Sequence, residues 1–165
     1  MLHNLISRTR RNHGLEHATL NLLQEHYPHQ SFAGHSDPGG FWIIGDIDAP
    51  RLTEITTQAL KKLQAGNQNL ALHKNCGTNM LTTGTMAGLA GAAGLIGTGN
   101  KKGSWWERLP LVILLATVAV IFSHPLGLYL QRNVTTSGNP GSLHITNVTT
   151  HQQGRVTAHR IQTQG

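Results

Sequence analysis

The sequence predicts an α+β fold class: a small cytoplasmic α-β-β-α-β domain, then a two-helix transmembrane hairpin, then a short β-rich C-terminal tail. Three observations lead to this prediction. Residues 1–79 combine two helical patterns with a pair of strand patterns around a turn. Residues 80–130 contain two long uncharged runs, and residues 131–165 alternate β-forming with polar side chains.

The first predicted helix and the first predicted hairpin are both bounded by turn-forming residues. Residues 4–27 repeat leucine and isoleucine at helical spacing, and Pro28 follows their end. Residues 36–40, Ser-Asp-Pro-Gly-Gly, favour a turn because Asp accepts backbone hydrogen bonds, Pro fixes φ and Gly adopts positive φ. We therefore expect a β-hairpin formed by residues 31–35 and 41–46.

The remaining soluble elements follow from the same signals. Pro50 is typical of the first turn of a helix, the apolar side chains after it repeat at helical spacing, and Gly66 ends the pattern. Residues 70–73 are predicted to form a short strand. In the tail, the alternation in residues 142–148 and 155–162 predicts a small terminal β-hairpin.

Two apolar runs predict the membrane hairpin, so we expect the lipid bilayer to be a partner of the chain. Residues 109–130 carry no formal charge over about 22 positions, enough to cross a hydrocarbon core of ~30 Å. Trp105 and Trp106 precede this run and Tyr129 closes it, as in an aromatic belt. Residues 80–97 are also uncharged but rich in Gly, Ala and Thr, so a flexible loop is the alternative to a second span.

The run at residues 80–97 has the spacing of small residues that lets transmembrane helices approach closely. Gly84 and Gly88 are four positions apart, and so are Ala90 and Gly94. These four residues predict a contact between copies of the chain in a homo-oligomer.

Charge and cysteine content narrow the classes of partner. The chain has 13 Lys and Arg residues against 7 Asp and Glu residues, a formal net charge of +6. Such a balance is compatible with nucleic acid or an anionic membrane surface. No long basic run interleaved with aromatic residues occurs, so we expect no nucleic-acid partner. Cys76 is the single cysteine, which excludes an intrachain disulfide and favours a reducing compartment.

The predicted hairpin also sets the expected localisation. Two spans put residues 1–79 and 131–165 on the same side, and charged residues occupy the positions where a secretory signal would be apolar. Most basic residues lie in these two parts, which favours the cytoplasm, whereas Lys101, Lys102 and Arg108 in the connecting loop oppose it. We expect an integral membrane protein whose soluble parts face the cytoplasm.

The strongest functional signal is an H-x-x-E-H pentad at residues 13–17. Positions i, i+3 and i+4 share one helix face, so two imidazoles and one carboxylate are expected to point the same way. The pentad is the inverse of the H-E-x-x-H zinc signature. Sixty residues later, the segment His73-x-x-Cys76 offers further ligands of the types that zinc accepts. We therefore predict that Zn²⁺ is bound by His13, His17, His73 and Cys76.

Simpler interpretations stay open for several polar residues. Eleven histidines make accidental spacing common, so the pentad can equally be a hydrogen-bonded polar cluster. His35 and Asp37 can supply ligands or substrate contacts, or Asp37 can simply stabilise the predicted turn. His124 lies beside Pro125 within the second predicted span, where its ring can satisfy a carbonyl that the proline frees.

Three segments, RNHGLEHATLNLL, GHSDPGGFWIIGD and HKNCGTNMLTTG, resemble a family of small bacterial membrane proteins classed as a domain of unknown function. Its distinguishing feature is an H-G-x-E-H motif paired with a later H-x-x-C-G-T motif. The resemblance covers roughly residues 9–97 and, more weakly, the second span and the tail. It implies the membrane architecture and a metal site, and it implies no activity. The similarity to inverted-motif metallopeptidases is confined to the pentad.

These residues lead to the expectation of a membrane-anchored zinc-binding protein. If the site is catalytic, His13 and His17 hold the metal with His73 or Cys76 as the third ligand and a water in the open position. The protein is then a metal-dependent hydrolase of peptidase or amidase type, with Glu16 as the general base. If all four predicted ligands bind the metal, the site is structural. Without a metal, the chain is an integral membrane protein that acts as an interaction or assembly module. The substrate is not identified by the sequence.

Overall fold

The computed structural model describes residues 2–97 and 104–165, and the chain divides into two compact units. The first unit extends to His73 and resumes with Arg132–Gly165, and the second is Lys74–Gln131. The C-terminal segment therefore belongs with the N-terminal one and is not a separate tail. The expected boundary at residue 79 also moves, since His73 ends the first stretch of the first unit.

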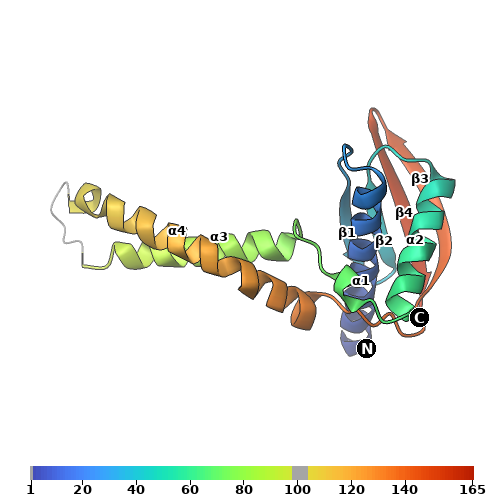
Figure 1. Cartoon of the computed structure of the whole chain (residues 1–165), viewed down its shortest axis with the longest axis horizontal. Helices are drawn as coiled ribbons and strands as arrows, with labels where there is room; N and C mark the ends of the chain where they lie inside the picture. The colour runs from blue at the N-terminus through green and yellow to red at the C-terminus, as the bar shows by residue number, and fades with distance from the viewer. Residues whose placement is uncertain (1, 98–103) are drawn as a thin grey trace. The chain divides into compact units, whose positions relative to one another are not determined.

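The first unit is built from two long helices and a four-stranded sheet (Figure 1). In chain order, its elements are α1 (Leu2–His26), β1 (Ala33–Asp37), β2 (Gly40–Ile44), α2 (Ala49–Gln64), the 3₁₀ turn η1 (Gln68–Ala71), β3 (His144–Gln153) and β4 (Val156–Gln164). A π-helical turn, η2 (Gln131–Thr135), precedes the last two strands.

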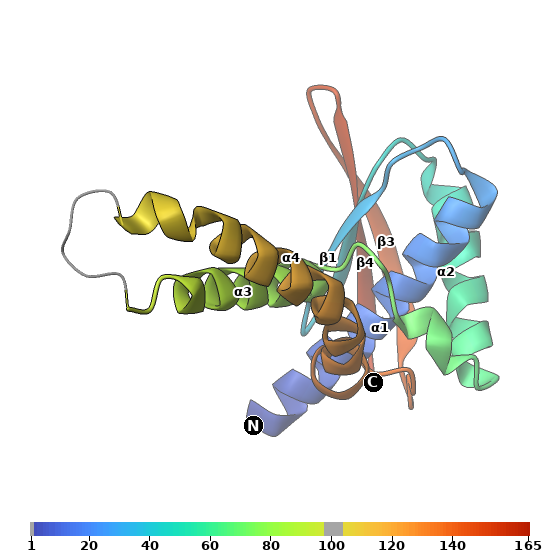
Figure 2. The same ribbon diagram turned by 60° about the vertical axis from the view of Figure 1, so that its left-hand side comes forward.

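The sheet has the antiparallel order β1-β2-β4-β3, so the C-terminal hairpin pairs directly with the N-terminal one. In this pairing Phe41 lies opposite Ile161, and both are fully buried. Helices α1 and α2 cover one face of the sheet, as Figures 1 and 2 show. Their apolar side chains, including Leu15 and Leu52, complete one hydrophobic core with the sheet. The fold is thus a two-layer α/β arrangement.

Several predicted elements are confirmed with shifted ends. The Asp37–Gly40 pair closes a tight β1–β2 turn, so the strands begin and end nearer the turn than expected. At the start of α2, the Asp48 side chain accepts a hydrogen bond from the Arg51 amide at 3.0 Å, and Pro50 occupies the first turn. Such a cap stabilises a helix by about 1 kcal/mol.

The strand predicted at residues 70–73 is wrong. This segment is the end of the 3₁₀ turn η1 and the chain after it. The carbonyls of Leu70 and Leu72 both accept hydrogen bonds from the Asn21 side chain at 3.0 Å. A side chain of α1 thus takes the place of the neighbouring strand that a β-conformation would have needed.

The second unit contains α3 (Gly77–Gly94) and α4 (Ser104–Leu130), which lie side by side in both views (Figures 1 and 2). The hydroxyls of Thr83 and Ser123 are 2.7 Å apart across the pair. Part of the predicted loop at 99–108 lies outside the described residues, and its last five residues belong to α4.

The structure supports one candidate membrane span and not the predicted pair. Among the described residues, one helical stretch, Trp105–Thr135, is long and apolar enough to cross a membrane. Helix α3 fails the same test because threonines and Asn79 lower its hydropathy. The small residues predicted to form a homo-oligomer contact have different surroundings. Gly94 lies against Val112 of α4, whereas Gly84 and Gly88 have open space around them.

Strand pairing constrains the topology independently of hydropathy. β2 precedes the second unit in the chain, β4 follows it, and the two strands are hydrogen-bonded neighbours. Both must therefore lie on the same side of any membrane, so the chain between them crosses an even number of times or not at all.

Candidate metal centre

The middle of α1 is buried and yet polar. Asn12, Glu16, His17 and Thr19 are each at most 3% exposed. Buried polar groups are costly unless they are hydrogen-bonded, and all four have such partners. This stretch of helix is therefore organised around specific polar contacts as well as around the hydrophobic core.

Two pentad histidines make the same kind of contact through the same ring atom. His17 Nδ1 lies 2.8 Å from the Ala71 carbonyl oxygen, and His13 Nδ1 lies 3.0 Å from the Thr135 carbonyl oxygen. A carbonyl oxygen only accepts hydrogen bonds, so Nδ1 is the protonated donor in both rings. In the neutral form, the lone pair of each ring is consequently on Nε2.

His73 joins these two histidines in the first unit. The ring centroids of His13 and His17 are 4.3 Å apart, and those of His17 and His73 are 5.7 Å apart. Burial lowers the pKa of His73, and the neighbouring His17 lowers it further. The neutral imidazole, which is the form that binds metals, is thus favoured at position 73.

Cys76 is the N-cap residue of α3 and belongs to the second unit. Its Sγ accepts a hydrogen bond from the Thr78 amide at 3.4 Å. Helix N-termini favour the thiolate, the form in which cysteine binds metals. Three residues of chain span at most ~11 Å, so Cys76 is tethered close to His73.

Glu16 contacts β1, on which Ser36 donates a hydrogen bond to its carboxylate. Gly34, two residues earlier, leaves the space that the Glu16 carboxyl fills, since a Cβ at position 34 would overlap it. Burial raises the pKa of Glu16, whereas the Ser36 bond and the charges of His13 and His35 act in the opposite direction. The balance is a raised pKa for a buried carboxyl group, a feature that is frequent at functional sites.

Comparison with known proteins places the chain in a family. Residues 8–148 match the domain of unknown function DUF6391. The chain belongs to the DUF6391 family. The matched region includes α1 from residue 8 onward, both helices of the second unit and all four predicted ligands.

The chain is also similar to an individual protein. An uncharacterized protein of Picosynechococcus sp. (strain ATCC 27264 / PCC 7002 / PR-6) is 34% identical over 154 residues. The similarity covers 79% of this chain and 75% of that protein. No solved structure matches this DUF6391 chain.

Three contacts of the candidate metal centre were not predicted from the sequence. The carbonyls of Ala71 and Thr135 carry no side-chain signature, and Ser36 lay in a predicted turn. Gly14 was the available signal, because glycine within a helix costs about 1 kcal/mol relative to alanine and so indicates a close approach. A Cβ at position 14 would overlap the Ser137 carbonyl oxygen.

Asp37 has a structural role. Arg160 donates two hydrogen bonds to its carboxylate, at 2.7 and 2.8 Å, and the Gly39 amide donates a third at 2.7 Å. The Arg160 hydrogen bonds hold the pKa of Asp37 below its usual value. Asp37 therefore joins the β1–β2 turn to β4, as the simpler interpretation of the sequence held.

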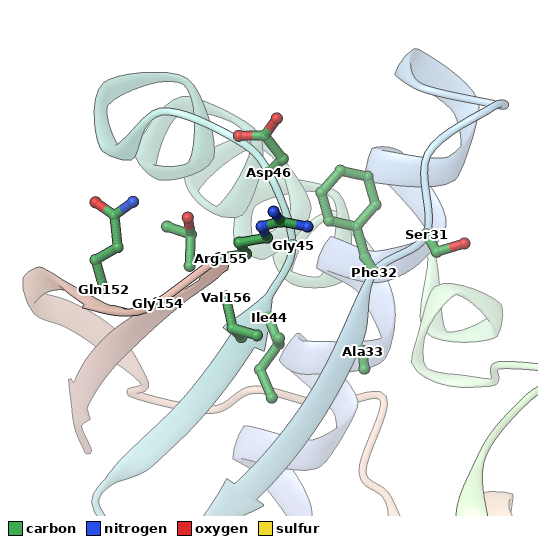
Figure 3. A pocket seen from close by; sticks show the side chains of 11 residues that line it. Ser31, Phe32, Ala33, Ile44, Gly45, Asp46, Gln152, Gly154, Arg155 and Val156 are labelled. Atoms are coloured by element: carbon green, nitrogen blue, oxygen red, sulfur yellow. The ribbon is translucent and has the colours of Figure 1, made fainter.

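A pocket of about 640 Å³ lies beside the β3–β4 turn (Figure 3). Phe32, Ile44 and Val156 supply apolar walls, and Asp46 and Arg155 supply charges. Neither Glu16 nor any predicted ligand lines this pocket, so it is separate from the histidine cluster.

Proposed function

We propose that this protein is a membrane-anchored zinc-binding protein with the ligands His13, His17, His73 and Cys76. The observation that carries the proposal is the pair of Nδ1–H bonds to the carbonyls of Ala71 and Thr135. Metal-binding histidines usually donate their other ring N–H to a carbonyl or carboxylate, which fixes the tautomer and the ring orientation. Here two adjacent rings have that arrangement.

The donor set is the reason to propose zinc. Three imidazoles and one thiolate match the nitrogen and sulfur ligands of tetrahedral zinc sites, in which ligand atoms are 2.0–2.3 Å from the ion. A thiolate also makes calcium or magnesium unsuitable, because both prefer oxygen ligands.

The membrane part of the proposal is a hairpin in which α3 crosses together with α4. The apolar surface of α4 supports it, since Ile113, Ile121 and Phe122 are each more than half exposed. The β2–β4 pairing requires an even number of crossings, which a span of α4 alone would violate. The contact of Gly94 with Val112 and the Thr83–Ser123 hydrogen bond are typical of packed transmembrane helices. We place the soluble parts in the cytoplasm.

Metal content of the purified full-length protein tests the zinc proposal. We expect about one zinc per chain in detergent-purified protein, and strong loss of zinc in His17→Ala. His29→Ala is the matched control, because His29 is an exposed histidine outside the cluster. Zinc-free wild type after purification with added zinc would refute the proposal.

A hydrolytic activity is the second candidate, and the environment of Glu16 favours it. In this version His13 and His17 would hold zinc with either His73 or Cys76 as the third ligand, and the open fourth position would take a water whose pKa the zinc would lower. Burial raises the pKa of the Glu16 carboxyl, which makes this group a stronger base than an ordinary carboxylate. Ser36 holds the carboxylate through a hydrogen bond, and the absence of a side chain at Gly34 leaves room for it. The substrate class is a peptide, an amide or an ester.

The Glu16→Gln variant separates a catalytic site from a structural one. For a general base we expect unchanged zinc content and a loss of about 10²–10⁴-fold in turnover of a peptide or ester substrate. Glu25→Gln serves as the control, since Glu25 is an exposed carboxylate on the same helix. Retained zinc with unchanged turnover would leave only the structural, four-ligand site.

A further inference from the structure

One stripe of α1 contacts both segments of the first unit that lead to the second unit. We call residues 68–73 the incoming connector and residues 132–138 the outgoing connector. The α1 stripe consists of five residues at helical spacing: Arg10, His13, Gly14, His17 and Asn21.

The incoming connector is held by two side chains of the stripe. His17 donates to the Ala71 carbonyl at 2.8 Å. Asn21 donates to the carbonyls of Leu70 and Leu72, each at 3.0 Å. All three acceptors are backbone atoms, so these bonds fix the path of the main chain.

The outgoing connector is held by the other end of the stripe. Arg10 Nη2 donates to the carbonyls of Asn133 and Thr136 at 2.9 and 3.0 Å. His13 donates to the Thr135 carbonyl at 3.0 Å. The main chain is again the acceptor throughout.

Gly14, between the two histidines, lets the outgoing connector lie directly on the helix. The space where its Cβ would be is occupied by the Ser137 carbonyl oxygen, and the Ala71 side chain is 3.4 Å from the same point. The Ser137 amide in turn donates to the Arg10 carbonyl at 2.9 Å. Both connectors therefore meet over one residue of the pentad.

The connectors also contact each other. Arg132 Nη2 donates to Asn69 Oδ1 at 3.0 Å. A Cβ at Gly138 would lie 2.6 Å from the Gln68 Cβ, so the two chains are in close contact there. The α1 stripe and the two connectors thus form one contiguous packed group.

We infer that zinc binding at His13 and His17 holds both connectors on α1, so that metal occupancy is communicated to the two ends of the helical hairpin. This inference rests on the proposed zinc site. Zinc held at Nε2 would fix each ring and would make its Nδ1–H a stronger donor to the connector carbonyl. By linkage, displacing the connectors must weaken zinc binding by the same factor.

Hydrogen exchange of the full-length protein, with and without zinc, tests the inference. The outgoing connector is the decisive segment, because it contains none of the proposed ligands. We expect zinc to slow amide exchange in residues 132–138 by about 5- to 150-fold, the usual range for coupled sites. The β3–β4 turn, where Gly154 has open space around it, should exchange at the same rate in both states.

A variant tests whether His13 couples zinc binding to the outgoing connector. In His13→Asn, the amide nitrogen replaces Nδ1 as donor to Thr135, while the Nε2 ligand is lost. At saturating zinc we expect the incoming connector to remain zinc-protected and the outgoing connector to lose its zinc dependence. Equal zinc protection of the outgoing connector in wild type and variant would refute this coupling through His13. Wild type that binds zinc without any slowing in 132–138 would overturn the inference alone, whereas wild type that binds no zinc would overturn the proposed function as well.

Discussion

Helices α1 and α4 are of similar length, 25 and 27 residues, and have opposite relations to their surroundings. α1 buries polar side chains: Asn12, Glu16 and His17 are at most 3% exposed. α4 exposes apolar ones: Ile121 and Phe122 are 66% and 65% exposed. Both the buried polar side chains of α1 and the exposed apolar side chains of α4 depart from the usual distribution of a water-soluble protein.

The two helices differ in what offsets the free-energy cost of these side chains. The buried polar groups of α1 are compensated by hydrogen bonds to β1 and to the connectors, so their burial indicates a specific site. The exposed apolar groups of α4 have no such compensation in water, where each Å² costs about 25 cal/mol. A lipid environment removes this cost, which is the physical basis of the proposed anchor.

The largest expected loss of stability comes from removing the buried His17 side chain of α1. His17→Ala leaves a cavity and an unpaired Ala71 carbonyl, so we expect a loss of about 2–4 kcal/mol in the free energy of unfolding, even without metal. Denaturant titration of the metal-free protein measures it. His29→Ala should change stability by less than about 0.5 kcal/mol. Equal stability of the two variants would mean that the buried polar contacts of α1 contribute little.

Introducing a charge on α4 tests whether lipid covers its exposed apolar side chains. Ile121→Arg puts a cation in the middle of the apolar run, at a cost of about 2.5–3.5 kcal/mol for membrane insertion. We expect a smaller fraction of the protein to resist alkaline extraction from membranes, with Ile121→Leu as the neutral control. An Ile121→Arg protein that is more soluble in water and otherwise unchanged would show that lipid does not cover α4.

Filling the glycine of the pentad tests whether the connectors lie directly on α1. Gly14→Ala places a Cβ where the Ser137 carbonyl oxygen lies, so we expect a loss of about 1–3 kcal/mol in stability. Gly84→Ala is the matched control, because this helical glycine has open space and alanine favours helices by up to about 1 kcal/mol. Thermal denaturation should separate the two, and a stabilised Gly14→Ala would contradict the contact.

The smallest expected effect is a pH dependence from His159 on β4. Burial lowers the pKa of this histidine, although the Ile47 carbonyl and the charge of Asp48 act the other way. Its contribution to stability is therefore complete above the unfolded pKa of 6.5 and is lost as the pH falls through the folded pKa. The contribution of Glu16 to the pH dependence of stability has the opposite sign, since a group with a raised carboxyl pKa destabilises the fold as the pH rises.

Unfolding of the metal-free protein at several pH values measures the His159 contribution. We expect a lower free energy of unfolding at about pH 5.5 than at about pH 7.5. His159→Asn keeps a donor toward Thr150 and removes the titrating ring, so it should flatten this dependence. A variant that retains the full wild-type dependence would assign it to other groups.

The sequence predicted the parts of the fold that depend on neighbouring residues. Pro50 was predicted in the first turn of α2 and residues 36–40 were predicted to close the first hairpin, because helix starts and turns depend on only a few adjacent positions. The sharing of one helix by His13 and His17 followed from helical periodicity in the same way. The strand predicted at 70–73 failed because a short apolar run does not reveal whether a neighbouring strand exists.

Chain order alone also misplaced the C-terminal hairpin. Its pairing with β2 joins residues more than one hundred positions apart, such as Phe41 and Ile161. Alternating β-formers specify that a strand exists, and they do not specify its partner.

By itself, the sequence determined the helices, the turns, the apolar run of α4 and the residue types of the proposed metal site, since each is encoded in side chains close together in the chain. The tertiary structure decided which groups orient those ligands. The partners of His13 and His17 are the backbone carbonyls of Thr135 and Ala71, and every residue carries the same carbonyl. Only the folded path of the chain places these two carbonyls against α1.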